Sequence, residues 1–527
     1  MPRELPARPN LEQLKKQAKS LLYAAQAHDR DALRRFAALP AFSGKSIDEI
    51  EAADLALHDA QSVIAREHGF PSWPALREEV EVRTLLLGEA VDEFLRCATG
   101  GASGRAERLL ALYPNIASAN LHTTLVLGDT ASVDARLRDH PALATQPGGP
   151  QNWEPLLYVC HSCMHANVAS RVDGFVAIAG RLCSLGANPN AEYHWNWHPE
   201  LPRTALWGSI CAVANLPLAE VLLKAGANPT DGVSVHIAGG GGNIEALDLL
   251  HRYGVNVNGV PGGVPPLVYM MSWSDNPAGP IWLLEHGADA NLAWGEAGEA
   301  PLHVAARRWD IPMVERLVRH GADVSRRRSD GATAHTLAEL HGNSDVVAWL
   351  LVHGAHDELS AVDRFAAACA RADRPAAEVL LAAQPSLRTD LLPEHHLMLH
   401  RPAESGNVAA LETMLACGFD PNTKDRDNVT SLHRAAMAGH PAAVRVLLQY
   451  GASVNAMDGM FSASPLVWAV EGRRTSKHDG ADHVEVARLL ITAGSPLGWT
   501  PPEGAPSAEG TLEGLAELRR AAERTPA

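Results

Sequence analysis

The residues best suited to chemistry lie close together between positions 194 and 200. The group consists of His194, Trp195, Trp197, His198 and Glu200. Aromatic rings, imidazoles and a carboxylate held on an exposed loop are typical of a surface that contacts a ligand. The alternative is that Trp195 and Trp197 fold inward as a small core that only anchors the loop. His194 and His198 have the i, i+4 spacing of a helical zinc pair, but Pro199 follows them and no helical pattern surrounds them, so we predict no metal site here.

The bulk composition limits the class of protein. The chain has 527 residues and a formal net charge of −16, with 46% hydrophobic and 20% charged residues. This balance is typical of a folded protein, and the length predicts several domains or an elongated repeat array. The negative charge disfavours nucleic acid or an anionic membrane surface as a partner. The sequence has neither a secretory signal nor an uncharged apolar run of about 18 residues, so we expect a soluble, cytoplasmic protein.

Seven cysteines are scattered along the chain. An odd number at irregular spacing favours reduced thiols over a disulfide framework. Cys160 and Cys163 form a C-x-x-C, but no second such pair completes a zinc site and both lie in an apolar run. We therefore predict that they are core residues, and we predict no metal and no cofactor.

A repeated phrase indicates the architecture. Segments of the form L-L-x-x-G-A have their glycines at 186, 226, 254, 287, 321, 354, 418, 451 and 494. Four of the eight spacings between neighbouring glycines are 33 or 34 residues and a fifth, of 64, is about two such periods; phrases such as APLHVAARRWD and TSLHRAAMAGH lie between them. This combination resembles the ankyrin repeat, clearly over residues 151–497. The resemblance implies an all-α solenoid of stacked helix-turn-helix units with finger loops and a concave face.

The physical chemistry of one repeat agrees with this resemblance. In TSLHRAAMAGHPAAVRVLLQYGASVN, Thr430 is predicted to cap a first helix and Gly439 to end it. A second helix is expected from Pro441, where proline is tolerated, to Gly451, which suits a left-handed residue. The predicted apolar faces contain Leu432, Ala435, Ala436, Val444, Leu447 and Leu448. Because helices this short cannot bury such faces alone, the units must stack.

The two ends of the chain break the period. In residues 1–84, NLEQ and SIDE predict helices capped by Asn10 and Ser46, and the second helix is expected to reach Gly69. This segment is similar to the helical segment that precedes ankyrin arrays in some bacterial proteins, and we expect it to cap one end of the solenoid, with partner docking as the alternative. Residues 85–150 are predicted to be degenerate repeats. Residues 498–527 are expected either to form one short helix over the other end or to lack structure.

Departures from the repeat are where we expect function. The spacing of 40 residues between Gly186 and Gly226 places extra residues in the finger loop between Asn190 and Thr204, which carries the 194–200 group. Other candidate binding residues occupy slots that are expected to face the groove: His161, Trp207, His236, Trp273, Arg307, Arg308 and His341. Since neighbouring repeats are roughly 10 Å apart, several of these residues could line one continuous trough suited to aromatic stacking and anion pairing.

Histidines in the P-L-H phrase need a separate interpretation. His303, His400 and His433 occupy this slot, where the resemblance implies a structural hydrogen bond within the repeat. His236 occupies the same slot but is followed by four glycines at 239–242. A segment without side chains lets a ligand or a bulky neighbour, such as Trp207 or Trp273, approach the backbone.

Two functions are consistent with these residues. The resemblance implies a binding scaffold that contacts a protein partner through its concave face and finger loops. The alternative is a small-molecule or catalytic site in the groove under the 191–203 insertion, with histidines as bases and Arg307 or Arg308 holding an anion. The sequence contains no nucleophile elbow, Walker loop, zinc-protease motif or dinucleotide fingerprint, which makes an enzyme the less favoured hypothesis.

Overall fold

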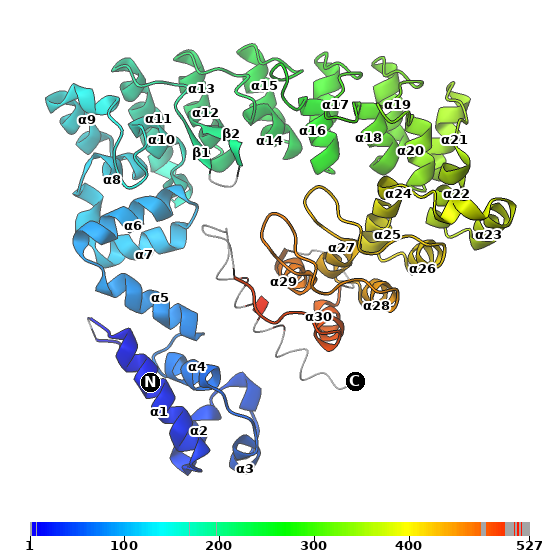
Figure 1. Ribbon diagram of the computed structural model, residues 1–527. Coiled ribbons are helices and arrows are strands. Elements are labelled where there is room, and N and C mark those ends of the chain that lie inside the picture. The colour runs from blue at the N-terminus through cyan, green and yellow to red at the C-terminus, as the bar shows by residue number, and fades with distance from the viewer. Residues whose placement is uncertain are drawn as a thin grey trace. The chain divides into compact units, whose positions relative to one another are not determined.

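The computed structural model describes residues 3–6, 8–167, 169–195, 198–475 and 481–500, with Thr511, Gly514, Leu515 and Leu518; the side chains at 166–171 and 195–201 are not included. Within these ranges the regular secondary structure consists of helices and one two-stranded sheet, joined by loops (Figure 1). Its contacts define two compact units. The first contains residues 1–234 and 249–254, and the second contains residues 235–248 and 255–527. None of the described helices has the length and apolar character needed to cross a membrane.

The first unit begins with α1 (Leu11–Gln26), α2 (Arg30–Phe36), α3 (Ile47–Glu51), α4 (Leu57–Glu67) and α5 (Trp73–Thr84). The predicted caps form: Asn10 accepts a hydrogen bond from the backbone of Gln13 at 3.1 Å, and Ser46 and Glu49 make a capping box. The prediction that the second helix reaches Gly69 is wrong. That helix ends at Glu51, and Asp59 starts α4 by accepting a hydrogen bond from the Ala56 backbone at 3.0 Å.

Charged and polar contacts join this N-terminal segment to the helices that follow it. The Tyr113 hydroxyl donates to the carbonyl oxygens of Val82 and Leu85 at 3.0 and 2.9 Å. Arg108 forms an ion pair with Glu79 on α5. Burial opposes ionisation of Glu79, but hydrogen bonds from Arg108 and Arg83 outweigh it and lower its pKa. These contacts support the predicted role of residues 1–84 as a cap, which remains a proposal.

Helix pairs fill the rest of the first unit. They are α6 (Leu87–Thr99), α7 (Ser103–Leu112), α8 (Leu121–Val126), α9 (Thr130–Asp139), α10 (Pro155–Cys160), α11 (Ala169–Ser184), α12 (Ala205–Trp207) and α13 (Leu216–Lys224). Strands β1 (Glu192–Trp195) and β2 (His198–Thr204) lie between α11 and α12, and a π-helical turn at Gly208–Ala212 follows α12. Short 3₁₀ helices cover Pro40–Phe42, Pro114–Ser118, Pro141–Ala144 and Cys163–Asn167.

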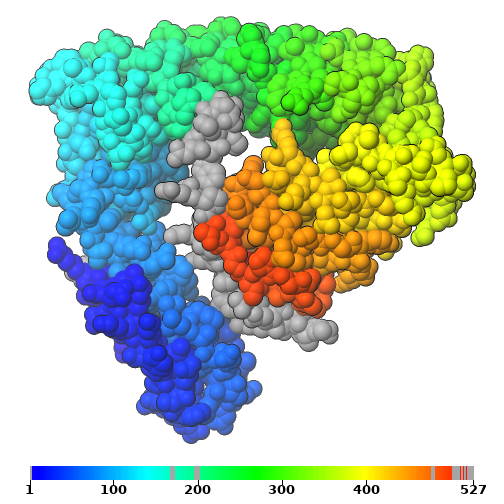
Figure 2. All heavy atoms as spheres, in the orientation of Figure 1, coloured from blue at the N-terminus to red at the C-terminus, as the bar shows by residue number. Residues whose placement is uncertain are grey.

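The second unit continues the same pattern, although residues 249–252 of its second helix belong to the first unit. Its elements are α14 (Ser234–Gly240), α15 (Ile244–Arg252), α16 (Pro266–Trp273), α17 (Ala278–Glu285), α18 (Pro301–Arg308), α19 (Ile311–Arg319), α20 (Ala334–Leu340), α21 (Ser344–Val352), α22 (Ala361–Ala370), α23 (Arg374–Ala383), α24 (Pro393–Leu397), α25 (His400–Ser405), α26 (Val408–Ala416), α27 (Ser431–Ala438), α28 (Pro441–Gln449), α29 (Pro465–Thr475) and α30 (His483–Thr492), with a 3₁₀ helix at Pro385–Arg388. First helices contact first helices, as α16, α18 and α20 do, and side chains fill the space between neighbouring pairs (Figure 2). Stacking of this kind is what the repeat predicts.

The repeat that contains Thr430 has the predicted structure. α27 ends before Gly439 and α28 before Gly451, and both glycines have positive φ, +73° and +85°. Of the predicted apolar residues, five are fully buried and Leu448 packs partly buried against them. Local capping and apolar spacing therefore explain both helices of this repeat.

Asparagines in the finger loops link one repeat to the next. The side-chain amide of Asn291 donates to the carbonyl oxygen of Gly321 at 2.7 Å, and its oxygen accepts from the backbone of Asp323 at 2.8 Å. Asn190 and Asn422 make the equivalent pair of bonds to the glycine and finger of their following repeats. Each of these asparagines lies four residues after the glycine of its own repeat. The bonds fix the stacking distance at the finger side of the array.

The histidines of the P-L-H phrase make structural hydrogen bonds, but His400 is not one of them. His303 and His433 each accept a backbone N–H through Nδ1 and donate through Nε2 to a carbonyl oxygen of the next finger. In the repeat of α24 and α25 the same position is held by His395, which accepts from the Leu392 backbone and donates to Asp363. The expectation that His400 makes this structural hydrogen bond is therefore wrong, since its Nε2 has no hydrogen-bond partner among the described residues.

Four of the cysteines and two leucines of the C-terminal tail are buried in the core, whereas Cys163, predicted to be a core residue, is only partly buried. All seven cysteines are free thiols, and Cys160 is fully buried. Leu515 and Leu518 are buried in the core of the second unit, and the Thr511 hydroxyl donates to Glu471 of α29. Thr511, Gly514, Leu515 and Leu518 are helical, whereas residues 498–500 are not, and a short helix over this end of the array remains a prediction.

Candidate functional site

The predicted finger insertion forms a β-hairpin. β1 and β2 pair antiparallel, with Tyr193 opposite Arg203 and a bulge at His194 and Trp195. Aromatic residues favour strand pairing, which explains why this finger is extended and not irregular. His194 is exposed and lies 3.7 Å from the carboxylate of Glu192. The side chains of Trp195, His198 and Glu200, and all of Trp197, lie outside the described residues, so their ligand contacts remain predictions.

Aromatic side chains pack against the hairpin. The ring of Tyr193 stacks on Trp153 with centroids 4.1 Å apart and meets His161 edge-on at 5.1 Å. His161 in turn stacks on Trp207 at 5.6 Å, and the Arg203 guanidinium lies 4.3 Å from the Trp207 ring centroid. We call Trp153, His161, Tyr193 and Trp207 the Tyr193 cluster. The cluster anchors the hairpin to the array, which is the alternative role predicted for the neighbouring tryptophans.

His161 acts in this cluster as a neutral packing group. It is buried, and its Nε2 donates a hydrogen bond to the carbonyl oxygen of Thr204 at 3.2 Å. Burial, reinforced by the charge of Arg203, lowers the pKa of His161 to about 4. Gly208, at the start of the π-helical turn, lets α12 approach closely, since a Cβ there would lie 2.7 Å from His161 Nε2. The sequence signals His161 and Trp207 but not Trp153 or Tyr193, which reach the cluster from separate fingers.

In the second unit an exposed aromatic patch lies at the end of α16. Trp273 is 48% exposed and contacts Tyr269 and Trp294, with centroids 4.9 and 6.1 Å away. The guanidinium of Arg426, from the finger before α27, lies 5.9 Å from the Trp273 ring. We call Tyr269, Trp273, Trp294 and Arg426 the Trp273 patch. Its arginine comes from a repeat far along the chain, and periodicity alone does not predict that contact.

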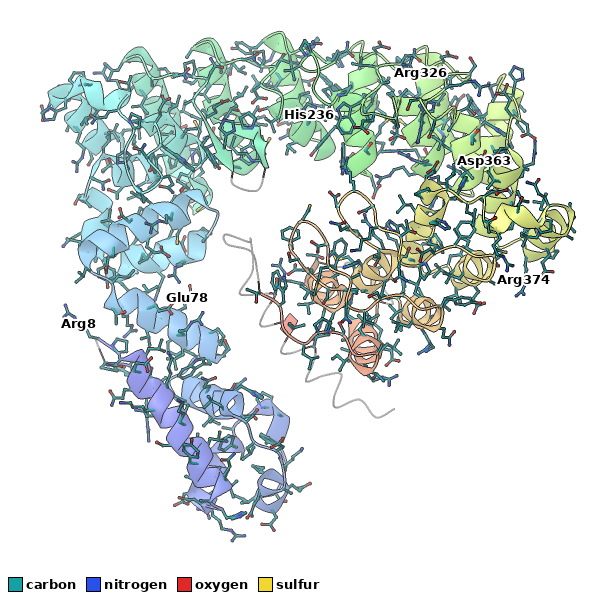
Figure 3. The ribbon with its side chains drawn as sticks, in the orientation of Figure 1. Arg8, Glu78, His236, Arg326, Asp363 and Arg374 are labelled. Carbon is teal, nitrogen blue, oxygen red and sulfur yellow. The ribbon has the colours of Figure 1, made fainter. Side chains whose placement is uncertain are left out.

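His236 lies on α14 (Figure 3) and contacts Tyr269 of this patch. It is buried, donates through Nε2 to the carbonyl oxygen of Val264 at 2.7 Å, and meets Tyr269 edge-on at 5.1 Å. The glycines that follow it do admit a bulky neighbour, but this neighbour is Met270: a Cβ on Gly239 would lie 1.9 Å from the Met270 methyl carbon. His236 therefore has the same bond to the next finger as the structural histidines.

Arginines surround the C-terminal ends of α18 and α20. Arg307 pairs with Glu299 at 2.6 Å, and Arg308 pairs with Asp275 and donates to the carbonyl oxygen of Ser272. Arg401, at the start of α25, donates to the carbonyl oxygens of Arg307 and His341. It thus brings two predicted residues together, although Arg401 itself is not among the residues predicted from the sequence.

The pKa of His341 is lowered by its surroundings at this place. Burial lowers its pKa to about 3, and the charges of Arg307, Arg401 and Arg328 lower it further. A cavity of about 610 Å³ opens beside it, lined by residues of α18, α20, α22 and α24 and of the loops between repeats. A second cavity, of about 540 Å³, lies on the other side of His341 against α25.

The predicted residues fall into both units. His161, His194 and Trp207 belong to the first, whereas His236, Trp273, Arg307, Arg308 and His341 belong to the second. The second unit joins Arg307 to His341 through Arg401, and Arg308 to Trp273 through the Ser272 carbonyl oxygen. A single trough running from Trp207 to His341 remains a prediction. Among the described residues, no group of three or more histidine, cysteine or acidic side chains is arranged to hold a metal ion.

Comparisons with known proteins identify the repeat. A model of ankyrin repeats in three copies matches residues 280–361 and 399–497. A segment of 61 residues is 44% identical to the 2-5A-dependent ribonuclease of Homo sapiens, and one of 58 residues is 43% identical to that of Mus musculus; they cover 12% and 11% of this chain. The chain spans 8% of the length of each ribonuclease. The solved structure of the human ASB11 ankyrin repeat domain matches 45% of this chain and 98% of its own, with 23% identity and a TM-score of 0.33. This chain therefore contains ankyrin repeats, and its fold is the all-α ankyrin-repeat solenoid.

Proposed function

We propose that this chain is a scaffold that binds a protein partner through the concave face and finger loops of its ankyrin repeats. Repeats of this kind generally mediate interactions between proteins, and solenoids present extended concave binding surfaces. The Trp273 patch carries the proposal. Tryptophan and arginine are the residue types most enriched at interface hot spots, and here a half-exposed tryptophan lies beside an arginine.

The proposed contact surface is narrower than the full set of predicted residues. Trp273 and Arg308 present side chains to solvent, and Arg308 holds the end of α16 through the Ser272 carbonyl oxygen. His161 and His236 are buried and bonded to backbone carbonyls, so we assign them to the support of the array. The hairpin finger, with exposed His194, is a second proposed contact.

The test compares two exposed aromatic residues of the second unit. Partners are captured from a cell lysate on the immobilised wild-type chain, and the dissociation constant of the strongest partner is measured for wild type, Trp273→Ala and Tyr450→Ala. Tyr450 is 44% exposed at the end of a second helix, α28, and serves as the matched control. We expect Trp273→Ala to weaken binding by roughly tenfold or more, as hot-spot truncations do, and Tyr450→Ala to have little effect. Equal affinities for all three proteins would contradict the proposed surface.

The alternative, a small-molecule or catalytic site under residues 191–203, has weaker support. The rings of the Tyr193 cluster contact one another there, and His161 uses Nε2 for a backbone carbonyl. A small-molecule site has better support in the second unit, at the cavity against Arg401.

A further inference from the structure

The cavity against α25 has a lining unlike the rest of this acidic protein. It measures about 540 Å³ and lies where α20, α22 and α25 end or begin. None of the described residues that line it has a carboxylate. Its nonpolar lining residues are Leu340, Gly342, Ala370, Met398 and Pro402. Its polar lining side chains are His341, Ser344, Arg371, Arg401, Ser405 and Asn407. We call it the Arg401 cavity.

Arg401 has unused hydrogen-bonding capacity. A guanidinium carries five N–H donors. Both bonds of Arg401, to the carbonyl oxygens of Arg307 and His341, come from Nη1. The edge formed by Nε and Nη2, which fits two oxygens of a carboxylate or phosphate at once, has no hydrogen bond or ion pair within the described residues. Arg401 is therefore held in place by one nitrogen while its bidentate edge stays available.

Charge around Arg401 is unbalanced. Arg371 pairs with Glu339 and Arg307 with Glu299, so these two arginines have counter-ions of their own. Burial, followed by the charge of Arg308, lowers the pKa of Arg401, and Glu404 opposes this only in part. The lowered pKa of His341 has the same origin in burial and neighbouring arginines. Neighbouring arginine charges thus add to burial in lowering the pKa of both groups.

Two helices begin at the same cavity. Ser344 is the first residue of α21 and Asn407 precedes α26, and both line the cavity. The residue before α21, Asn343, does not cap it, because its side-chain amide donates to the carbonyl oxygens of Ala306 and Trp309. Within the described residues no side chain caps the start of α21, whose first turn carries the acidic Asp345, and N–H groups at a helix start favour an anion.

We propose that the Arg401 cavity binds a small phosphate monoester, with the phosphate group on the Nε–Nη2 edge of Arg401 and near the start of α21. Phosphate supplies three acceptor oxygens, which suits a site with a guanidinium edge, hydroxyls of Ser344 and Ser405 and helix N–H groups better than a carboxylate does. The cavity volume lies in the range of small-molecule pockets. A net charge of −16 disfavours a long polyanion. This function goes beyond the scaffold role and requires no protein partner.

Titration calorimetry with phenyl phosphate, benzoate and a phosphoserine peptide tests the proposal on the full chain. We expect Arg401→Gln to weaken phenyl phosphate binding on the order of tenfold or more, and Arg401→Lys to weaken it less, since lysine keeps the charge but not the edge. The matched control is Arg319→Gln: Arg319 is exposed on α19 and pairs with Glu315. It should bind like wild type. Circular dichroism establishes that each variant is folded.

A second variant keeps the test decisive if Arg401→Gln unfolds. Ser405 is exposed at the rim, and Ser405→Asp adds a negative charge there without removing an internal bond, so it should abolish phenyl phosphate binding. Absence of phenyl phosphate binding at 10 mM, or equal loss in Arg319→Gln, would overturn the site. Equal affinity for benzoate would overturn the phosphate assignment, and a peptide that binds more than about tenfold tighter than phenyl phosphate would overturn the small-molecule assignment. Trp273→Ala should leave phenyl phosphate binding unchanged, so this proposal and the scaffold proposal fail independently.

Discussion

The Tyr193 cluster and the Arg401 cavity contain similar residue types, yet they differ in how completely those residues satisfy one another. In the first, Tyr193 stacks on Trp153, His161 donates to a backbone carbonyl and Arg203 covers Trp207. In the second, Arg401 keeps one edge without a described partner, and Asn343 leaves the start of α21 uncapped. Aromatic, histidine and arginine residues therefore indicate binding only where donors and charges remain unused.

The largest expected effect is a loss of stability at mildly acidic pH, and both regions contribute to it. Burial lowers the pKa of His161, His165 and His400 to about 4 and that of His341 to about 3. Unfolded histidines titrate near 6.5, so the unfolded chain binds more protons between these values. The free energy of unfolding should therefore fall as pH falls from about 6.5 towards 4, by up to about 1.4 kcal/mol per pH unit for each histidine.

Urea unfolding at pH 7, 6 and 5 measures this effect above the range in which most carboxylates titrate. His161→Gln should reduce the slope of the unfolding free energy with pH. His194→Gln, which changes an exposed histidine, should not. A slope that both variants leave unaltered would mean that the Tyr193 cluster does not hold its histidine neutral.

A medium effect is expected when the hairpin loses its anchor. Tyr193→Ala removes the stacked contact with Trp153 and the edge contact with His161, so we expect a loss of about 2 kcal/mol of unfolding free energy. Tyr23→Ala, at a tyrosine that is 69% exposed, is the control and should change it by less than about 0.5 kcal/mol. If the two variants unfold at the same urea concentration, the cluster is not an anchor, and the contrast with the Arg401 cavity disappears.

The smallest expected effect concerns the stability of the Trp273 patch. Because Trp273 is 48% exposed, Trp273→Ala should lower the free energy of unfolding by at most about 1 kcal/mol, less than Tyr193→Ala. The same urea titration measures it. A loss as large as that of Tyr193→Ala would assign Trp273 to the support of the array and remove it from the proposed contact surface.

The parts of the fold that depend on local chemistry could be predicted from the sequence. Thr430, Gly439 and Gly451 define two helices through caps and left-handed residues that act within a few positions of the chain. The predicted helix to Gly69 fails for the same reason, since Asp59 provides a competing cap.

The candidate sites depend on contacts between residues that are distant in the sequence, and these contacts could not be predicted from the sequence. Arg426 reaches Trp273, and Arg401 reaches the carbonyl oxygens of Arg307 and His341. These contacts depend on how successive repeats curve, which the period does not specify. His400 illustrates a second limit: a histidine near a proline resembles the repeat phrase, but His395 makes the repeat's hydrogen bond.

The asparagine links between fingers have a consequence for how such an array changes length. Asn190, Asn291 and Asn422 each bond the glycine carbonyl and the finger backbone of the repeat that follows. Because these couplings are interchangeable, removing or duplicating one whole repeat returns every donor to an equivalent acceptor. An insertion within a finger also leaves these bonds in place, since Asn190 keeps both of them although the finger that follows it is lengthened by the hairpin, so the array accepts changes of length in whole repeats and in finger loops.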